Sequence, residues 1–245
     1  MLLDNTKNGF ILKSNFELNK AYFLFKIISS RTLTNIAKNL LNISLKLKLP
    51  IHFLVRSTVF KQFCSGETLD ESYETVKKLN EKNVKSYLHY SVEGVENEDS
   101  YDSSHDDVKE AITFASKKNI LDFTVFKPTA IASSILLEKI SKGIELSNEE
   151  KILYDKVLTR FDNICKLAAE KNIKILIDAE ESWIQTAIDD LALKMMIRYN
   201  KTSAIVYNTS QMYRHDRLKY LNELKKLSIE NSFHVGVKLV RGAYI

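Results

Sequence analysis

From about residue 70 onward, amphipathic stretches alternate with short apolar runs along the chain. In each amphipathic stretch the apolar side chains recur every three or four positions, which predicts a helix with one buried face. The apolar runs are rich in β-branched and aromatic residues, which predicts strands. The predicted strands span residues 87–92, 123–126, 173–177, 204–207 and 235–240. The predicted order of elements is therefore βαβαβαβαβ.

The predicted helices also carry signals for where they begin and end. Two helix starts contain a capping box, Thr68 with Glu71 and Ser147 with Glu150. Asparagine tolerates the left-handed conformation that closes a helix, and one stands near each helix end, at positions 83, 119, 172, 200 and 231. After Ser147, one apolar stripe is expected to face the sheet: Leu153, Val157, Phe161, Ile164 and Ala168.

Strands that are apolar nearly throughout suit a parallel sheet that is covered on both faces, with helices as crossovers. Five such strands fit either a doubly wound α/β fold or part of a closed (β/α)8 barrel. The chain contains neither GxGxxG nor GxxxxGKS/T, so a dinucleotide or P-loop site has no support. As a barrel, the chain would be incomplete, with about five of eight strand-helix units and two open sheet edges.

The chain is predicted to have two parts. Residues 1–67 are expected to form a mainly helical N-terminal arm that Pro50 interrupts, and residues 68–245 the strand-helix domain. Within the second part, residues 94–107 are rich in Asp and Glu but lack the ligand spacing of an EF-hand. We expect a solvated loop there.

Composition excludes several classes of function. With 245 residues and 44% apolar side chains, the chain can bury the core of one domain, or of one domain plus an appendage. Its net charge of +5 comes from 36 basic and 31 acidic residues without a dense basic patch, so we expect no nucleic-acid partner. Cys64 and Cys165 form no CxxC pair, which argues against structural zinc or a disulfide framework and suits a reducing compartment.

Charged residues interrupt every apolar run before it is long enough to span a membrane. The first residues lack the pattern of a secretory signal, and Asp4 and Glu17 argue against a mitochondrial presequence, so we expect a cytoplasmic protein. Residues 21–28 and 40–54 are apolar with flanking lysines. We expect them to pack on the main domain, and the alternative is peripheral contact with the inner membrane.

Polar side chains follow four of the predicted strands, at the carboxyl ends where strand-helix barrels carry their active sites. A lysine on an apolar strand is expensive to bury unless it meets an anion, so Lys127 and Lys238 indicate anionic groups above the sheet. Asp178 is an internal candidate, and a Lys127–Asp178 salt bridge is the alternative to a ligand site. Asn208 and Gln211 either bind a ligand or cap the next helix.

Other residues offer less chemistry. Tyr244, beyond the fifth strand, either stacks on a ligand ring or belongs to the core. Trp183, Ile184 and Ile188 are expected on a helix, in the core. The five histidines show no metal-ligand spacing, so we expect no metal site.

Four segments in this order, FKPTA, ILIDAEES, VYNTSQMY and VKLVRGAY, together resemble the flavin-dependent proline dehydrogenase family. A weaker resemblance includes residues 87–94 and extends the similarity to roughly residues 55–245. The family resemblance implies an incomplete (β/α)8 TIM-type barrel that binds FAD and oxidises L-proline to 1-pyrroline-5-carboxylate, the first step of proline catabolism. A hydride would pass to flavin N5, and a quinone is the implied electron acceptor.

The resemblance also implies a role for each strand-end residue. Lys127 would contact the proline carboxylate, and Asp178 would lie beside it and orient the groups around the amine. Leu239 and Tyr244 would shape the substrate pocket. The implied flavin contacts come from Asn208, Gln211, Lys238 and Val240.

In that family, a pair of arginines that completes carboxylate binding, and much of the FAD surface, lie beyond the fifth strand. We therefore expect this chain to be a fragment that oxidises proline poorly or not at all by itself. Two other classes stay open: a Schiff-base lyase or aldolase with Lys127 or Lys238 as nucleophile, and a non-catalytic truncated remnant.

Overall fold

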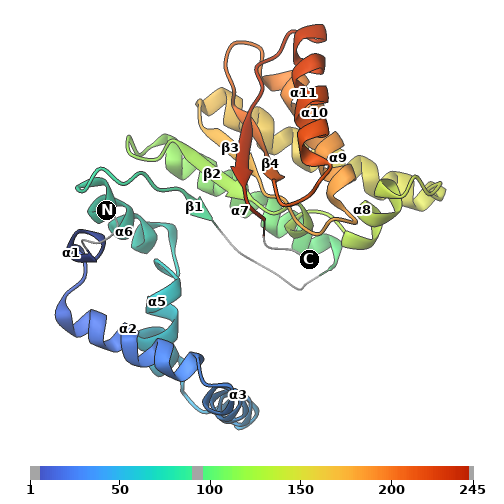
Figure 1. Ribbon diagram of the computed structural model, residues 1–245. Helices are drawn as coiled ribbons and strands as arrows, with labels where there is room; N and C mark the ends of the chain where they lie inside the picture. The colour runs from blue at the N-terminus through green and yellow to red at the C-terminus, as the bar shows by residue number, and fades with distance from the viewer. Residues whose placement is uncertain (1–5, 90–95, 243–245) are drawn as a thin grey trace. The chain divides into compact units, whose positions relative to one another are not determined.

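The apolar runs form one parallel five-stranded sheet in the computed structural model, which describes residues 6–89 and 96–242. The strands lie side by side in the order of the sequence (Figure 1). They are β1 (Leu88–His89), β2 (Phe123–Phe126), β3 (Lys174–Ile177), β4 (Val206–Gln211) and β5 (Val237–Val240). A doubly wound sheet reverses its order at a switch point, whereas barrel strands follow one another. The predicted fold class, an α/β fold with part of a barrel, is confirmed.

Helices connect these strands: α7 (Glu98–Ser116), the 3-10 turn η2 (Pro128–Ala130), α8 (Ser134–Ser141), α9 (Asn148–Lys171), α10 (Gln185–Tyr199) and α11 (Arg217–Glu230). Crossovers between parallel strands are right-handed, so a sheet in sequential order carries its helices on one face. In agreement, α7 packs on β2, α9 on β3 and α10 on β4. We call this helix-covered face the outer face and the opposite face the inner face.

The register assigns each strand residue to a face. The ring of Phe126 lies 5.3 Å from that of Phe161 on α9, so Phe126 points outward. Side chains alternate along a strand, and paired residues share a face. The outer face therefore carries Phe126, Ile177 and Asn208, which are paired in register, and the inner face carries Val125, Leu176 and Tyr207.

A buried asparagine fixes the starts of β4 and β5. Asn200 follows α10, and its side chain accepts hydrogen bonds from the backbone N–H groups of Ile205 (3.0 Å) and Val206 (2.8 Å). The same amide donates to the carbonyl oxygens of Val206 (2.9 Å) and His234 (2.8 Å). One side chain thus satisfies four backbone groups that would otherwise be unpaired, and it holds both strand starts in register.

Two strands differ in length from their predicted runs. The run 204–207 becomes a strand that ends at Gln211, because pairing with β5 continues through Gln211 and Val240. The apolar pattern missed the second half of this strand because Asn208 to Gln211 are polar. All four residues are nevertheless buried. The first run, 87–92, lies partly outside the described residues, and its described part is the strand Leu88–His89.

The solvated loop predicted for residues 94–107 is wrong from Glu98 onward, where α7 begins. The Asn97 side chain caps the helix by accepting a hydrogen bond from the backbone of Ser100 (2.8 Å). Acidic residues in the first turn also favour a helix, because they face its positive end. Two of the acidic side chains have a partner too: Arg160 on α9, which is buried, contacts Glu98 and Asp102 at 2.8 Å each.

Helix α9 follows its predicted pattern. Ser147 and Glu150 form the full capping box, and Asn172 ends the helix in the left-handed conformation with φ of 53°. The predicted stripe faces the sheet, and four of its members are buried: Val157, Phe161, Ile164 and Ala168. Trp183 does not behave as predicted. It lies in the turn before α10 and is 49% exposed, while the adjacent Ile184 is fully buried.

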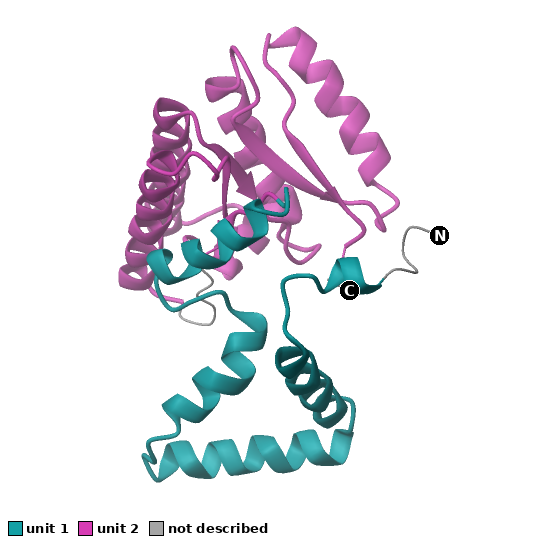
Figure 2. Cartoon of the chain, turned by 90° about the vertical axis from the view of Figure 1, so that its left-hand side faces the viewer, with its two compact units in different colours: residues 1–84 teal, residues 85–245 magenta. Residues whose placement is uncertain are grey.

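The chain divides into two compact units, residues 1–84 and 85–245, which have separate colours in Figure 2. The helices of the first unit are α1 (Thr6–Gly9), α2 (Asn15–Ile28), α3 (Arg31–Lys46), α4 (His52–Val55), the π-helix η1 (Arg56–Phe60), α5 (Lys61–Phe63) and α6 (Leu69–Asn80). Pro50 separates α3 from α4, as expected. The predicted arm ended at residue 67, and the structure groups α6 with it. Among the described residues, no helix is both long and apolar enough to cross a membrane.

Replacing Phe161 with Ala should lower the free energy of unfolding by about 3–5 kcal/mol, because the change removes a fully buried ring and leaves a cavity against Phe126. Urea unfolding measures the loss. Ile152→Ala on the same helix is the matched control, since Ile152 is 62% exposed, and it should change stability by less than about 0.5 kcal/mol. Equal losses in the two variants would contradict the assigned faces of α9.

Candidate functional site at the carboxyl ends of the strands

Four side chains form a row across the inner face, just beyond the ends of β2 and β3 and within β4 and β5. Phe126 pairs with Ile177, so the residues that follow them, Lys127 and Asp178, are neighbours on the inner face. Asp178 continues the ladder, since its N–H donates to the carbonyl oxygen of Phe126 (3.0 Å). Asp178 is next to Thr209, and Thr209 pairs with Lys238. The row therefore reads cation, anion, hydroxyl, cation.

Within this row, Asp178 and Lys238 form an ion pair. Strand β4 lies between β3 and β5, so the two side chains meet over Thr209. The Thr209 hydroxyl is buried and has no hydrogen-bond partner in the described part of the chain. The predicted salt bridge between Lys127 and Asp178 is thus replaced by a pair with the more distant lysine, and the Lys238–Asp178 pair keeps about a quarter and a fifth of its side-chain surface exposed (25% and 21%).

Two of the predicted flavin contacts lie together at the end of β4 and β5. Gln211 and Val240 are paired in register, on the same face as Lys238. Gln211 is buried, and its side-chain amide donates to the carbonyl oxygen of Glu180 (2.7 Å). The inner face thus brings together Lys127, Asp178, Gln211, Lys238 and Val240.

Two other predicted site residues lie on the outer face. Asn208 pairs with Ile177 in register, and its amide donates to Asp189 on α10 (2.8 Å) and to the hydroxyl of Tyr220 on α11 (2.8 Å). Both of its donors are used on the side of the helices, and its predicted hydrogen bond to a flavin ring stays a prediction. Leu239 is 62% exposed on the outer face, and its predicted place in the substrate pocket stays a prediction. Tyr244 lies outside the described residues.

Glu180 is a buried site residue that the sequence alone did not single out. Its carboxylate accepts hydrogen bonds from the backbone N–H (2.8 Å) and the hydroxyl (2.6 Å) of Thr129, which follows β2. Burial raises the pKa of the Glu180 carboxyl above its usual range, and the Thr129 hydrogen bonds and the charge of Lys127 oppose this rise. The only sequence signal was its place in the segment ILIDAEES.

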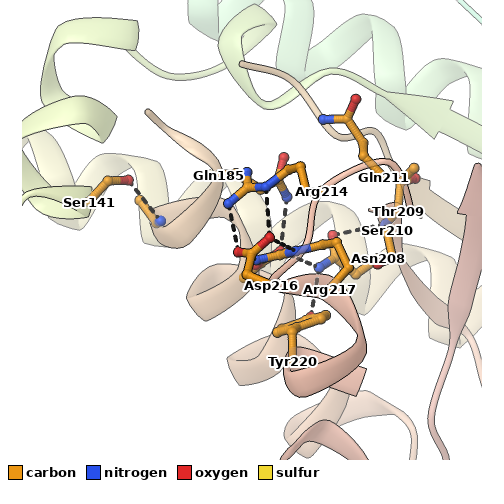
Figure 3. A network of polar contacts seen from close by, with 12 residues as sticks. Ser141, Gln185, Asn208, Thr209, Ser210, Gln211, Arg214, Asp216, Arg217 and Tyr220 are labelled. Carbon is orange, nitrogen blue, oxygen red and sulfur yellow. Dashed lines mark hydrogen bonds and ion pairs between the residues drawn. The ribbon is translucent and has the colours of Figure 1, made fainter. Parts of the chain in front are cut away.

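A second polar cluster, on the outer face, supports β4 from behind (Figure 3). Asp189 is its centre: it accepts hydrogen bonds from Asn208, from Gln185 (2.9 Å) and from Arg217 (2.6 Å). Arg217 also binds Asp216, and this contact holds the pKa of the Asp216 carboxyl well below its usual range. The cluster escaped sequence reasoning because its members come from α10, β4 and α11 and carry no local motif.

Within residues 6–89 and 96–242, no three His, Cys, Asp or Glu side chains group in a way that would hold a metal ion. The polar groups of the site are lysines, carboxylates, an amide and a hydroxyl. Such a set binds an organic anion by charge and hydrogen bonds, and it can orient a second polar group beside that anion.

Comparison with known proteins agrees with this arrangement. A sequence model of the proline dehydrogenase family matches residues 72–245. This chain belongs to the proline dehydrogenase family. It is 29% identical to proline dehydrogenase 1, mitochondrial, of Dictyostelium discoideum, in a match that covers 98% of this chain and 49% of that protein.

Two further similarities concern a second relative and the fold. The chain is 31% identical to the carbapenem antibiotics biosynthesis protein CarD of Pectobacterium carotovorum subsp. carotovorum, over 77% of this chain and 50% of that protein. Its fold is similar to that of proline utilization A from Bdellovibrio bacteriovorus, with a TM-score of 0.62, 18% identity and coverage of 75% of this chain and 20% of that one. The chain thus spans about half the length of the curated relatives it matches.

Replacing Asp189 with Asn should lower the free energy of unfolding by about 3 kcal/mol, because a buried amide cannot accept from all three donors and leaves the buried Arg217 with one carboxylate fewer. Thermal or urea unfolding measures the change. Asp190→Asn, the same substitution at an exposed position one residue later, should leave stability nearly unchanged. A loss in both variants, or in neither, would show that the outer cluster does not anchor β4.

Proposed function

We propose that this protein, like the family to which it belongs, oxidises L-proline to 1-pyrroline-5-carboxylate with FAD as cofactor. The observation that carries the proposal is the inner-face row of Lys127, Asp178, Thr209 and Lys238, which lies just beyond β2 and β3 and within β4 and β5. Proline has one carboxylate and one ring nitrogen, and this row offers cations for the first and a carboxylate for the second.

The inner face also has groups that fit a flavin. The buried Thr209 hydroxyl lacks a partner in the described residues, and a ligand with polar ring atoms would supply one. We assign Gln211, Lys238 and Val240 to hold FAD, since they lie together on the end of β4 and β5. When bound, FAD supplies the chemistry of accepting a hydride from the substrate carbon.

The remaining residues position the substrate. Lys127 is proposed to bind the proline carboxylate by a charge-assisted hydrogen bond. Asp178, which already pairs with Lys238, would hold the amine side of proline and keep that lysine oriented. Asn208 supports this surface from behind through its hydrogen bond to Asp189.

The rival enzyme class uses a lysine as a Schiff-base nucleophile. Such a lysine needs a free amine to attack a carbonyl carbon, and the Lys238 side chain is already bound to the Asp178 carboxylate. Borohydride trapping of a carbonyl substrate on Lys127 or Lys238 would support the rival. A non-catalytic remnant would bind neither flavin nor carbonyl compounds.

The proposal is tested on the full-length protein with FAD in the absence of oxygen. We expect bound flavin, and loss of its oxidised absorbance on addition of L-proline but not of D-proline. Re-oxidation by a soluble quinone analogue would support a quinone as the electron acceptor. Flavin that stays oxidised with L-proline would overturn the proposal.

Replacing Lys127 with Met should raise KM for proline about ten- to a hundredfold with a smaller change in kcat, because a charge-assisted contact with the carboxylate is lost. Steady-state kinetics with the full-length protein measures this. Lys174→Met is the matched control. Lys174 lies on the same inner face but at the opposite end of β3, over the ring of Phe123 (4.9 Å). The KM for proline of the Lys174→Met variant should therefore be unchanged. Unchanged KM in Lys127→Met would refute the assigned role.

We further propose that the first unit makes peripheral contact with an anionic lipid surface. Residues 18–66 contain eight basic residues and no acidic one: Lys20, Lys26, Arg31, Lys38, Lys46, Lys48, Arg56 and Lys61. On α3, apolar side chains at helical spacing form a stripe that is exposed: Leu33, Ile36, Leu40 and Ile43. An exposed apolar stripe beside excess positive charge matches the interface of an anionic bilayer. The relatives' names state a mitochondrial location, and a cytoplasmic location of this chain remains a prediction.

Replacing Ile36 and Leu40 together with Ser should weaken binding to phosphatidylserine-containing vesicles by at least about tenfold, since two apolar side chains no longer enter the interface. Co-sedimentation measures the bound fraction. Asn35→Ser with Asn42→Ser, on the polar side of α3, is the matched control and should bind as the wild type does. Wild-type protein that stays in solution with these vesicles would contradict lipid contact and favour packing of the stripe on protein.

A further inference from the structure

Glu180 joins the ends of three strands and one helix. Its carboxylate holds Thr129, just after β2, through two hydrogen bonds of 2.8 and 2.6 Å. Its backbone N–H donates to the side chain of Gln185 at the start of α10 (3.1 Å), and its carbonyl oxygen accepts from Gln211 at the end of β4 (2.7 Å). The residue itself follows β3, and only 4% of its surface is exposed.

Burying a carboxylate costs free energy unless hydrogen bonds satisfy its oxygen atoms. Because the loss of a partner would leave a buried oxygen unpaired, the partners are held in place. Thr129 supplies two of these hydrogen bonds, from its backbone N–H and its hydroxyl. Glu180 is therefore a fixed point and not a mobile surface acid.

The contact of Glu180 with Thr129 also constrains the backbone of Lys127. The two residues are separated only by Pro128, whose ring fixes its own backbone angle. The turn η2 is closed by the N–H of Ala130, which donates to the carbonyl oxygen of Lys127 (3.0 Å). Holding Thr129 thus holds the backbone of Lys127, and the nearby charge of Glu180 attracts its ammonium group.

We propose that Glu180 is the positioning residue of the site: it sets the place of Lys127 through Thr129 and that of Gln211 through its own carbonyl group. This inference rests on the proposed function, because Lys127 is assigned to the substrate carboxylate there. Glu180 would not touch proline itself, and its side chain would act on substrate binding more than on flavin binding, since Gln211 uses only the backbone of Glu180.

The test compares Glu180→Ala with Glu180→Gln, which keeps an acceptor for Thr129, and with Glu181→Ala as control. Glu181 is the next residue, and its side chain makes no hydrogen bond or ion pair within the described residues. In Glu180→Ala we expect KM for proline to rise about tenfold, with kcat per bound flavin and flavin content unchanged. Glu180→Gln should restore most of the affinity, and Glu181→Ala should match the wild type. A residue that only stabilised the fold would lower the amount of active protein without moving KM.

Hydrogen–deuterium exchange gives a readout that does not depend on activity. The Thr129 amide should exchange about tenfold faster in Glu180→Ala than in the wild type, and nearly as slowly as the wild type in Glu180→Gln. If the wild type does not reduce flavin with proline, the proposed function fails, while this exchange still decides whether Glu180 holds the turn. An unchanged exchange rate, or an unchanged KM in an active enzyme, would overturn the inference.

If Glu180→Ala does not fold, Thr129→Val and Thr129→Ser take its place. The first removes only the hydroxyl bond to Glu180, and the second keeps it. We expect KM to rise about threefold to tenfold in Thr129→Val and to stay at the wild-type value in Thr129→Ser. Equal KM values in the two variants would also overturn the inference.

Discussion

The site depends on the register of parallel strands β2 to β5. Because side chains alternate in strands, a slip of one residue in β4 would turn Thr209 and Gln211 to the helices and Asn208 to the inner face. The register is held at one end by Asn200, which bonds the starts of β4 and β5, and farther along by the contact of Asn208 with Asp189. Polar groups therefore fix a sheet whose apolar residues alone would tolerate several alignments.

Strand β4 consequently has two polar faces with different tasks. Its outer face enters a buried cluster in which Asp189 accepts from three side chains, and this cluster has a structural role. Its inner face presents Thr209 and Gln211 beside an ion pair that is about one-quarter exposed. A buried hydroxyl without a partner costs stability, so its presence on the inner face fits a surface that is completed by a ligand. Glu180 connects the two faces, since its backbone reaches both Gln185 and Gln211.

Local signals were reliable where neighbours in sequence decide the structure. The run 123–126 became β2, and the Ser147 capping box and the left-handed Asn172 bound α9, because each depends on a few adjacent residues. The prediction for residues 94–107 was wrong where the acidic residues looked solvated, since their partner Arg160 lies on another helix. The prediction for Trp183 was wrong for a similar reason. Its neighbours Ile184 and Ile188 fill the core, and the turn before α10 leaves the indole exposed.

The sequence by itself determined the order of strands and helices, the family, and the set of polar residues at the strand ends, because these follow from local periodicity and short motifs. The tertiary structure decided which of these residues share a face and which partner each one takes. Asn208 and Leu239 lie outside the inner face because β4 and β5 pair in a register set by contacts from distant helices. Asp178 meets Lys238 and not Lys127 because their side chains converge over a strand that lies between them.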